Sequence, residues 1–171
     1  MAIIKTVRGF TPVFGKDCFL ADNAVVVGEV LMGERCTVWF NAVVRGDVHS
    51  ITIGDDTNIQ DGAIIHCTYQ KAKTVIGSKV SIAHAAVVHG CTLADNVLVG
   101  MGAIIMDDAV VGEHSVIAAG AIVLPGTKIE PGSIYGGIPA KRIKDIGPEM
   151  REVIARTARN YPMYATWYDK Q

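Results

Sequence analysis

The sequence lacks the features that mark several large classes of protein. No apolar run approaches the roughly 18 residues that a membrane-spanning helix needs, because Gly, Asp, Asn or Glu interrupts every few positions. Its 16 Lys and Arg residues are balanced by 17 Asp and Glu, so the clustered basic excess typical of nucleic-acid binding is missing. The four cysteines form no CxxC pair, and the first residues contain no apolar signal segment. We therefore expect a cytoplasmic protein with no membrane or nucleic-acid partner.

Aromatic residues are also few, at 6%, although half of the 171 residues are hydrophobic. This length suits a single domain over residues 1–171 with one real core. The high apolar fraction further indicates that some surface is buried between subunits.

A period of six residues orders the hydrophobic positions. Apolar residues recur at this spacing in four runs: Leu20, Val26, Met32, Val38 and Val44; Ile53, Ile59 and Ile65; Ile76, Ile82 and Val88; and Leu93, Val99, Ile105, Val111, Ile117, Val123, Ile129 and Tyr135. A small residue usually stands four positions after each of them, as Ala24 and Ala63 do. One branched and one small inward residue per six is what a triangular solenoid requires. We predict an all-β solenoid, a left-handed parallel β-helix of hexapeptide repeats over about residues 10–143. An antiparallel sandwich is disfavoured because its hairpin turn signals are missing.

The period breaks in three places. The step between inward residues is nine from Val44 to Ile53, eleven from residue 65 to residue 76, and five from residue 88 to residue 93. We interpret the first break as one short coil and the second as a protruding loop within residues 67–74. Breaks in a repeat are common positions for functional residues.

After residue 143 the pattern becomes helical. Pro148 suits the first turn of a helix, and Glu149 and Glu152 follow it where carboxylates favour the helix dipole. The apolar face contains Met150, Val153, Ile154, Thr157, Ala158 and Tyr161. We predict an amphipathic C-terminal helix over about residues 147–161, ended by Pro162, covering one side of the solenoid, and then a tail.

Two histidines occupy equivalent positions in consecutive coils. His66 follows the inward Ile65, and His89 follows the inward Val88. Stacked coils lie about 4.8 Å apart, so we expect both imidazoles in one outward column, close enough to share a metal ion. His84 belongs to another face, one corner away, and should reach that ion only from a neighbouring subunit. Three imidazoles with an open fourth position are the ligand set of a catalytic zinc site, and the same set can bind iron(II).

Polar residues near these histidines favour the metal interpretation. Arg45 and Gln60 each follow an inward residue directly, and we expect them at one column position on the adjoining face. Asp47 can pair with Arg45, and Asn58 flanks Gln60. Such a cluster is typical of the groups that surround and orient metal ligands.

Taken in order, these residues resemble the gamma-class carbonic anhydrases. The resemblance covers about residues 10–143 and lies in Arg45-Gly46-Asp47, Asn58-Ile59-Gln60-Asp61-Gly62, His66, Ala83-His84 and His89-Gly90. It implies a homotrimeric lyase that converts carbon dioxide reversibly to bicarbonate with hydroxide bound to Zn²⁺ at the subunit interfaces.

The resemblance also implies a role for each polar residue. The three histidines above would be the metal ligands, with His84 donated across a subunit boundary. Gln60, helped by Asn58, would hydrogen-bond the bound water or carbon dioxide. Arg45 and Asp47 would form an ion pair that orders the interface and the site.

The sequence departs from the best-studied members at two points. Val48 stands where they have a carboxylate, and the loop after the first histidine is short and contains no carboxylate in residues 69–74. Those acidic groups are thought to carry protons, so the chain resembles a short-loop subgroup of lower activity. Tyr161 or Tyr164 could transfer protons between the site and the solvent if the C-terminal helix folds back over the site. Packing is the simpler role for these two residues.

Three other interpretations of these features stay open. The segment at residues 136–141, Gly-Gly-Ile-Pro-Ala-Lys, also occurs in hexapeptide-repeat acyltransferases that use acyl-coenzyme A, although it can simply end the solenoid. The chain can also be an inactive scaffold that retains a metal site. Finally, outward histidines can be ordinary surface residues, as we expect for His49 and His114.

Overall fold

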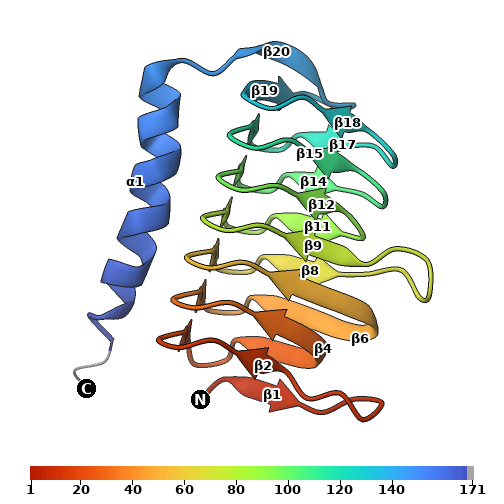
Figure 1. Cartoon of the computed structure of the whole chain (residues 1–171), viewed down its shortest axis with the longest axis vertical. Helices are drawn as coiled ribbons and strands as arrows, with labels where there is room; N and C mark the ends of the chain where they lie inside the picture. Colours follow the sequence, from red (N-terminus) through yellow and green to blue (C-terminus); the bar gives the residue numbers. More distant parts are fainter. Residues whose placement is uncertain (169–171) are drawn as a thin grey trace.

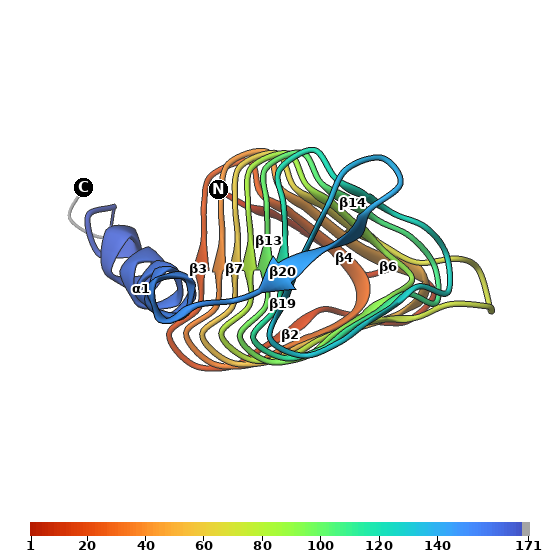
Figure 2. The same cartoon turned by 90° about the horizontal axis from the view of Figure 1, so that it is seen from above.

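The computed structural model describes residues 1–168 and is a left-handed parallel β-helix with one α-helix along its side (Figure 1). Seen along its axis, the solenoid has a triangular cross-section (Figure 2). Each coil contributes a short strand to each of three flat faces, which we number in chain order. The predicted fold class is confirmed.

Each face is a stack of parallel strands. Face 1 contains β1 (Ile3–Lys5), the first part of β4 (Val25–Met32), the first part of β6 (Val43–Ile53), β8 (Ile64–His66), β11 (Val87–His89), β14 (Ile104–Ile105) and β17 (Ile122–Val123). Face 2 contains β2 (Val13–Phe14), the second parts of β4 and β6, β9 (Thr74–Ile76), β12 (Thr92–Leu93), β15 (Val110–Val111) and β18 (Lys128–Ile129). Face 3 contains β3 (Phe19–Leu20), β5 (Thr37–Val38), β7 (Asn58–Ile59), β10 (Ser81–Ile82), β13 (Leu98–Val99), β16 (Val116–Ile117) and β19 (Ser133–Gly136). The last strand, β20 (Lys141–Asp145), runs antiparallel to β19 and closes the solenoid.

The chain turns three corners in every coil. Corner A leads from face 1 to face 2, corner B from face 2 to face 3, and corner C from face 3 to face 1. All three breaks in the six-residue period lie at corner A, where the loop at residues 67–74 protrudes (Figure 2). This corner is therefore the irregular edge of an otherwise regular prism.

The first break is an enlarged corner, and our interpretation of it as one short coil is wrong. β6 pairs with β8 at Val44 and with β9 at Ile53, so both of its ends remain in register with the next coil. The extra residues bulge outward between these pairs, because in-register stacking of the inward residues on both faces is more favourable than removing a face. The solenoid also begins earlier than predicted, since Ile3 already pairs with Val25.

The core consists of the inward residues that the period predicts. Val44, Ile65 and Val88 stack on face 1 and are 0% exposed, as are the small residues Ala42 and Ala63 at the preceding corner. Branched side chains fill the middle of each face and small ones fit inside the corners, so the interior is filled along the whole axis.

α1 (Pro148–Ala165) lies against face 3, where it contacts β5, β7 and β10. It buries Ile154 and Ala158 of the predicted apolar face. The helix continues through Pro162 and ends four residues later than predicted. Its last turn is held by packing, since Ala165 is buried and the Tyr164 and Trp167 rings lie 4.9 Å apart. No helix in residues 1–168 is long and apolar enough to cross a membrane.

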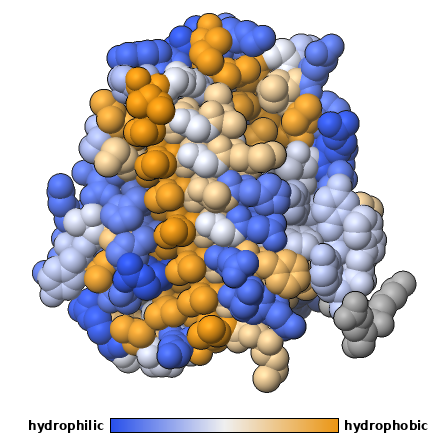
Figure 3. All heavy atoms as spheres, turned by 180° about the vertical axis from the view of Figure 1, so that it is seen from behind, coloured by the Kyte–Doolittle hydropathy of each residue, from blue (hydrophilic) through white to orange (hydrophobic). Residues whose placement is uncertain are grey.

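Face 1 presents an apolar stripe to its outer side. In six of its strands, the outward residue directly before the inward one is aliphatic and at least partly accessible: Val25, Val43, Ile64, Val87, Ile104 and Ile122. The stripe runs along the solenoid on the side opposite the view of Figure 1 (Figure 3). α1 covers face 3, so face 1 remains uncovered in the single chain.

The burial pattern predicts how stability responds on the two sides of one face. Replacing Leu93, which is 1% exposed and points inward on face 2, with Ala should cost about 2–5 kcal/mol, because it opens a cavity between coils. Replacing Leu31, which is 56% exposed on the same face, should change stability by about 0.5 kcal/mol or less. Chemical denaturation of both variants measures the difference, and equal losses would contradict the assignment of inward positions.

Candidate metal centre

Two imidazoles meet at corner A. β8 and β11 are in-register parallel strands in which His66 is the direct partner of His89. His66 Nδ1 lies 3.1 Å from His89 Nε2, and the ring centroids are 5.1 Å apart. The repeat therefore brings the two histidines into one outward column, as the sequence predicts.

A carboxylate holds the other side of the His66 ring. Asp47, in the enlarged corner of β6, has Oδ1 3.1 Å from His66 Nε2, while Arg45 Nη1 donates to Asp47 Oδ2 at 2.5 Å. Burial opposes ionisation of Asp47, but the hydrogen bonds from Arg45 and His66 outweigh it and lower the pKa of Asp47. Burial also lowers the pKa of His66, so this ring favours the neutral form that binds a metal.

A second carboxylate, which the sequence analysis missed, holds His89. Asp107 Oδ1 lies 2.6 Å from His89 Nδ1, and Thr68 Oγ1 donates to Asp107 Oδ2 at 2.5 Å. Asp107 comes two residues after the inward Ile105, at the same corner of the next coil. That position in the repeat was the available signal, but an aspartate there also looks like an ordinary turn residue.

Of the remaining predicted residues, His84 and Gln60 lie at corner C, on the opposite edge of face 1, and Asn58 lies in β7 just before that corner. His84 Nδ1 is 2.9 Å from Asp61 Oδ2 in the turn that leaves face 3. Gln60 Nε2 donates to Asn58 Oδ1 at 2.9 Å, and both residues are buried.

Arg45 and Gln60 do not share a column, so that prediction is wrong. Arg45 follows the part of β6 that pairs with β8 on face 1, whereas Gln60 follows β7 on face 3. The error has the same origin as the misread first break, because treating the enlarged corner as a short coil shifts the assignment of faces by one.

The donor set at corner A fits two positions of a metal site. Two nitrogens bound to one tetrahedral zinc ion at about 2.0–2.1 Å lie about 3.3 Å apart, close to the His66–His89 separation. Within residues 1–168 no group of three His, Cys, Asp or Glu side chains is arranged to hold a metal ion. One chain thus presents two half-sites, a pair of imidazoles at corner A and a single imidazole at corner C.

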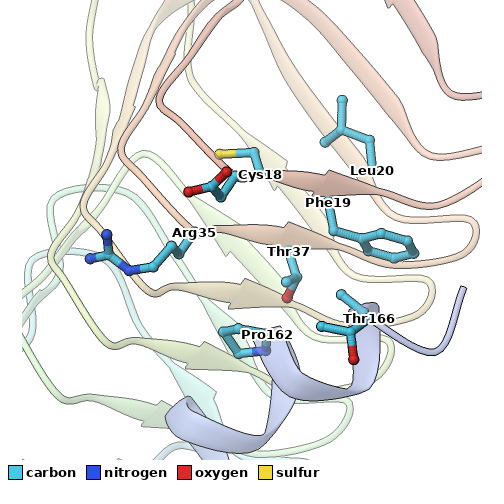
Figure 4. A pocket seen from close by; sticks show the side chains of 9 residues that line it. Cys18, Phe19, Leu20, Arg35, Thr37, Pro162 and Thr166 are labelled. Atoms are coloured by element: carbon cyan, nitrogen blue, oxygen red, sulfur yellow. The ribbon is translucent and has the colours of Figure 1, made fainter. Parts of the chain in front are cut away.

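Other candidate positions lie apart from these half-sites. Cys67 is buried, and burial raises the pKa of its thiol. A pocket of about 490 Å³ lies at corner B beside the end of α1, lined by Cys18, Phe19, Arg35 and Pro162 among others (Figure 4). A hydrogen bond from Cys36 lowers the pKa of Cys18 to about 7, but no predicted site residue lines this pocket.

The chain is similar to several known proteins. The family model described as bacterial transferase hexapeptide (six repeats) matches residues 90–125. The chain is 42% identical to a protein of Methanocaldococcus jannaschii named probable carbonic anhydrase, over 85% of this chain and 91% of that one. It is 40% identical to the mitochondrial gamma carbonic anhydrase 2 of Arabidopsis thaliana over 88% of this chain, and spans 56% of the length of that relative.

A solved structure extends the likeness to three dimensions. A Bacillus cereus protein, provisionally named an acetyltransferase, superposes with a TM-score of 0.95 at 34% identity, over 98% of this chain and 96% of that one. The structural relative and the sequence relatives therefore carry names from two different activities.

The contacts of His66 predict two pKa changes of opposite sign. The Asp47 carboxylate favours the protonated imidazole, so Asp47→Asn should lower the pKa of His66 further. The Arg45 charge disfavours protonation, so Arg45→Met should raise the pKa of His66. NMR titration of the imidazole resonances in chelator-treated protein measures both. Changes of the same sign in the two variants would show that the contacts at corner A are not those described.

Proposed function

Because this chain belongs to the gamma-class carbonic anhydrase family, we propose that it is a metal-dependent lyase that interconverts carbon dioxide and bicarbonate. Zn²⁺ is the expected metal, and Fe²⁺ suits the same ligands. The ligands would be His66 and His89 of one subunit together with the partner subunit's His84, in a homotrimer.

The convergence of two imidazole nitrogens at corner A is the observation that carries this proposal. His66 Nδ1 and His89 Nε2 face each other, and the opposite nitrogen of each ring is next to a carboxylate. Metal-binding histidines typically donate their second ring nitrogen to a carboxylate in this way, which fixes the ring and strengthens the ligand. Stacking of the coils alone brings the two rings together, but it does not by itself place a carboxylate beside the far nitrogen of each ring.

The two half-sites explain why a ring of subunits is needed. Corner A and corner C flank the apolar stripe of face 1, so a contact that covers the stripe can bring corner A of one subunit to corner C of the next. Such a contact uses two different surfaces, and three copies close it into a ring. The stripe then becomes buried, and each interface assembles three imidazoles.

A bound zinc ion would act as a Lewis acid that makes water nucleophilic near neutral pH, an effect whose magnitude was established on carbonic anhydrases themselves. Asp47 and Asp107 would keep the two imidazoles oriented. The hydrogen bond from Gln60 Nε2 to Asn58 fixes the Gln60 amide, so that Gln60 Oε1 would be the atom available to accept a hydrogen bond from water at the site. Arg45 would hold Asp47 in place through their ion pair.

The reaction releases a proton that must reach the solvent, and the described residues near the site include no good group to carry it. The loop at residues 67–74 contains Lys71 and Lys73 but no carboxylate. Tyr161 lies near Asp61 at corner C, and burial, with a contribution from the Asp61 charge, raises the pKa of Tyr161 to about 12. A phenol with so high a pKa is a poor proton carrier at neutral pH.

Acyl transfer is the second candidate, because the structural relative is provisionally named an acetyltransferase. Residues 136–141 are the shared segment, and here they cap the solenoid, since Gly137 O accepts from Ile122 N and Ala140 N donates to Ile122 O. Closing the last coil accounts for this segment without a bound coenzyme.

Metal binding should depend on both corners. We expect His66→Ala and His89→Ala, and also His84→Ala, to lose stoichiometric zinc, because each removes one of three ligands. His114→Ala is the matched control and should keep its zinc, since His114 lies in a turn at corner B. Atomic absorption on protein purified without chelator measures the zinc content. Full zinc in the His66→Ala protein would contradict the proposed ligand set.

Carbon dioxide hydration should be limited by proton transfer. We expect turnover to be slow in dilute buffer and to rise about tenfold or more with added imidazole buffer, because a positioned proton-transfer group contributes about 10²- to 10⁴-fold. Stopped-flow measurement with a pH indicator follows the reaction. A fast, buffer-independent turnover would reveal an internal relay, whereas acetyl-coenzyme A binding with no hydration would favour acyl transfer, and neither activity would favour a scaffold.

A further inference from the structure

We propose that Asp107 is a positioning residue that fixes the imidazole of His89 with Nε2 as its unprotonated nitrogen, turned toward His66. The metal-binding consequence of this inference rests on the function proposed above, whereas the state of the His89 ring is a property of the chain alone.

The geometry at His89 supports one arrangement of the ring proton. Asp107 Oδ1 lies 2.6 Å from His89 Nδ1, a distance typical of a hydrogen bond to a charged acceptor. An ionised carboxylate only accepts hydrogen bonds, so His89 Nδ1 must carry the proton. In the neutral ring Nε2 is then left with its lone pair, and Nε2 is the atom that lies 3.1 Å from His66 Nδ1.

Asp107 is itself held on its other side. Thr68 Oγ1 donates to Oδ2 at 2.5 Å, so both carboxylate oxygens are engaged and the side chain is only 17% exposed. An aspartate carboxyl is normally ionised at neutral pH, and here both of its oxygens accept hydrogen bonds, which favours the charged form.

Gly90 makes room for this carboxylate. A Cβ atom on Gly90 would lie 2.4 Å from Asp107 Oδ1 and 2.9 Å from Asp107 Cγ. Gly90 also has a φ of +57°, where most side chains are strained. The residue after His89 must consequently be small for the carboxylate to reach the ring.

The short loop at residues 67–74 takes part in this arrangement through Thr68. Thr68 stands at the base of the loop, which is pinned by a bridge between Thr68 and Ala72. The contact from Thr68 through Asp107 to His89 therefore parallels the contact from Arg45 through Asp47 to His66. The two contacts differ in charge, because Asp107 accepts from the neutral Thr68 on the side away from the imidazole, whereas Asp47 accepts from the cation Arg45.

The contacts of Asp107 do not fit an aspartate that only shapes the turn. Its neighbour Asp108 occupies the same turn, is exposed, and makes no side-chain hydrogen bond within the described part of the chain. Both of the Asp107 bonds instead join the turn to His89 and to the loop. An aspartate that served only the turn would resemble Asp108.

The test compares Asp107→Ala, Asp107→Asn and, as the control for charge, Asp108→Asn. The full chain is loaded with Zn²⁺, and affinity is measured by competition with a chromophoric chelator. We expect Asp107→Ala to bind zinc about 10- to 100-fold more weakly. Asp107→Asn retains an acceptor oxygen and should fall between Asp107→Ala and the parent chain. Asp108→Asn should match the parent chain.

A second readout needs no metal. In chelator-treated protein at neutral pH, two-bond ¹⁵N NMR correlations report which nitrogen of His89 carries the proton. We expect the Nδ1–H form in the parent chain and in Asp108→Asn, and a shift toward Nε2–H in Asp107→Ala. If the Asp107→Ala protein does not fold, the comparison of Asp107→Asn with the parent chain in chelator competition decides the matter.

The outcomes separate this inference from the proposed function. An Nε2–H form of His89 in the parent chain, or equal zinc affinity in all variants, would overturn the role of Asp107. A parent chain that binds no zinc but keeps the Nδ1–H form, lost in Asp107→Ala, would overturn the proposed function and leave the positioning role intact.

Discussion

In-register stacking of parallel coils is the constraint on which the rest of this structure depends. Each strand hydrogen-bonds to its equivalent in the next coil, so a residue at a given position of one repeat lies about 4.8 Å from the same position in the next. His66 and His89 meet for this reason alone, as partners in β8 and β11. The same constraint keeps both ends of β6 in register, so the extra residues of the first break bulge outward and place Asp47 against His66.

At corner A, hydrogen bonds to the carboxylates of Asp47 and Asp107 outweigh the unfavourable effect of burial on their charge. The two imidazoles lie close together, and each is next to a carboxylate whose pKa is lowered by its hydrogen-bond partners. Two carboxylates beside two imidazoles, with Arg45 paired to Asp47, leave corner A suited to a bound metal ion. Corner C adds a third imidazole beside Asp61, on the far side of an apolar stripe that the single chain leaves accessible.

Much of this could be predicted from the sequence because the hexapeptide period assigns faces by simple counting. The inward core and the shared column of His66 and His89 follow from it, while the helix that covers one side follows from the separate amphipathic pattern after residue 143. Counting fails where the period fails, so the enlarged corner at residues 44–53 led to a wrong column for Arg45. Asp107 was missed because an aspartate in a turn is common, and only its distance to His89 distinguishes it from Asp108. Pro162 was misread because packing after a proline can outweigh the loss of one backbone hydrogen bond.

The central claim is that each metal site is shared between two subunits, and mixing two complementary variants tests it most directly. One variant carries His84→Ala and the other carries both His66→Ala and His89→Ala, so neither can assemble three imidazoles alone. After the two are unfolded and refolded together in equal amounts, random pairing should restore about a quarter of the parent chain's zinc, because each mixed ring regains one intact interface. Zinc content no higher than in the separate variants, although mixed oligomers form, would contradict a site shared between subunits.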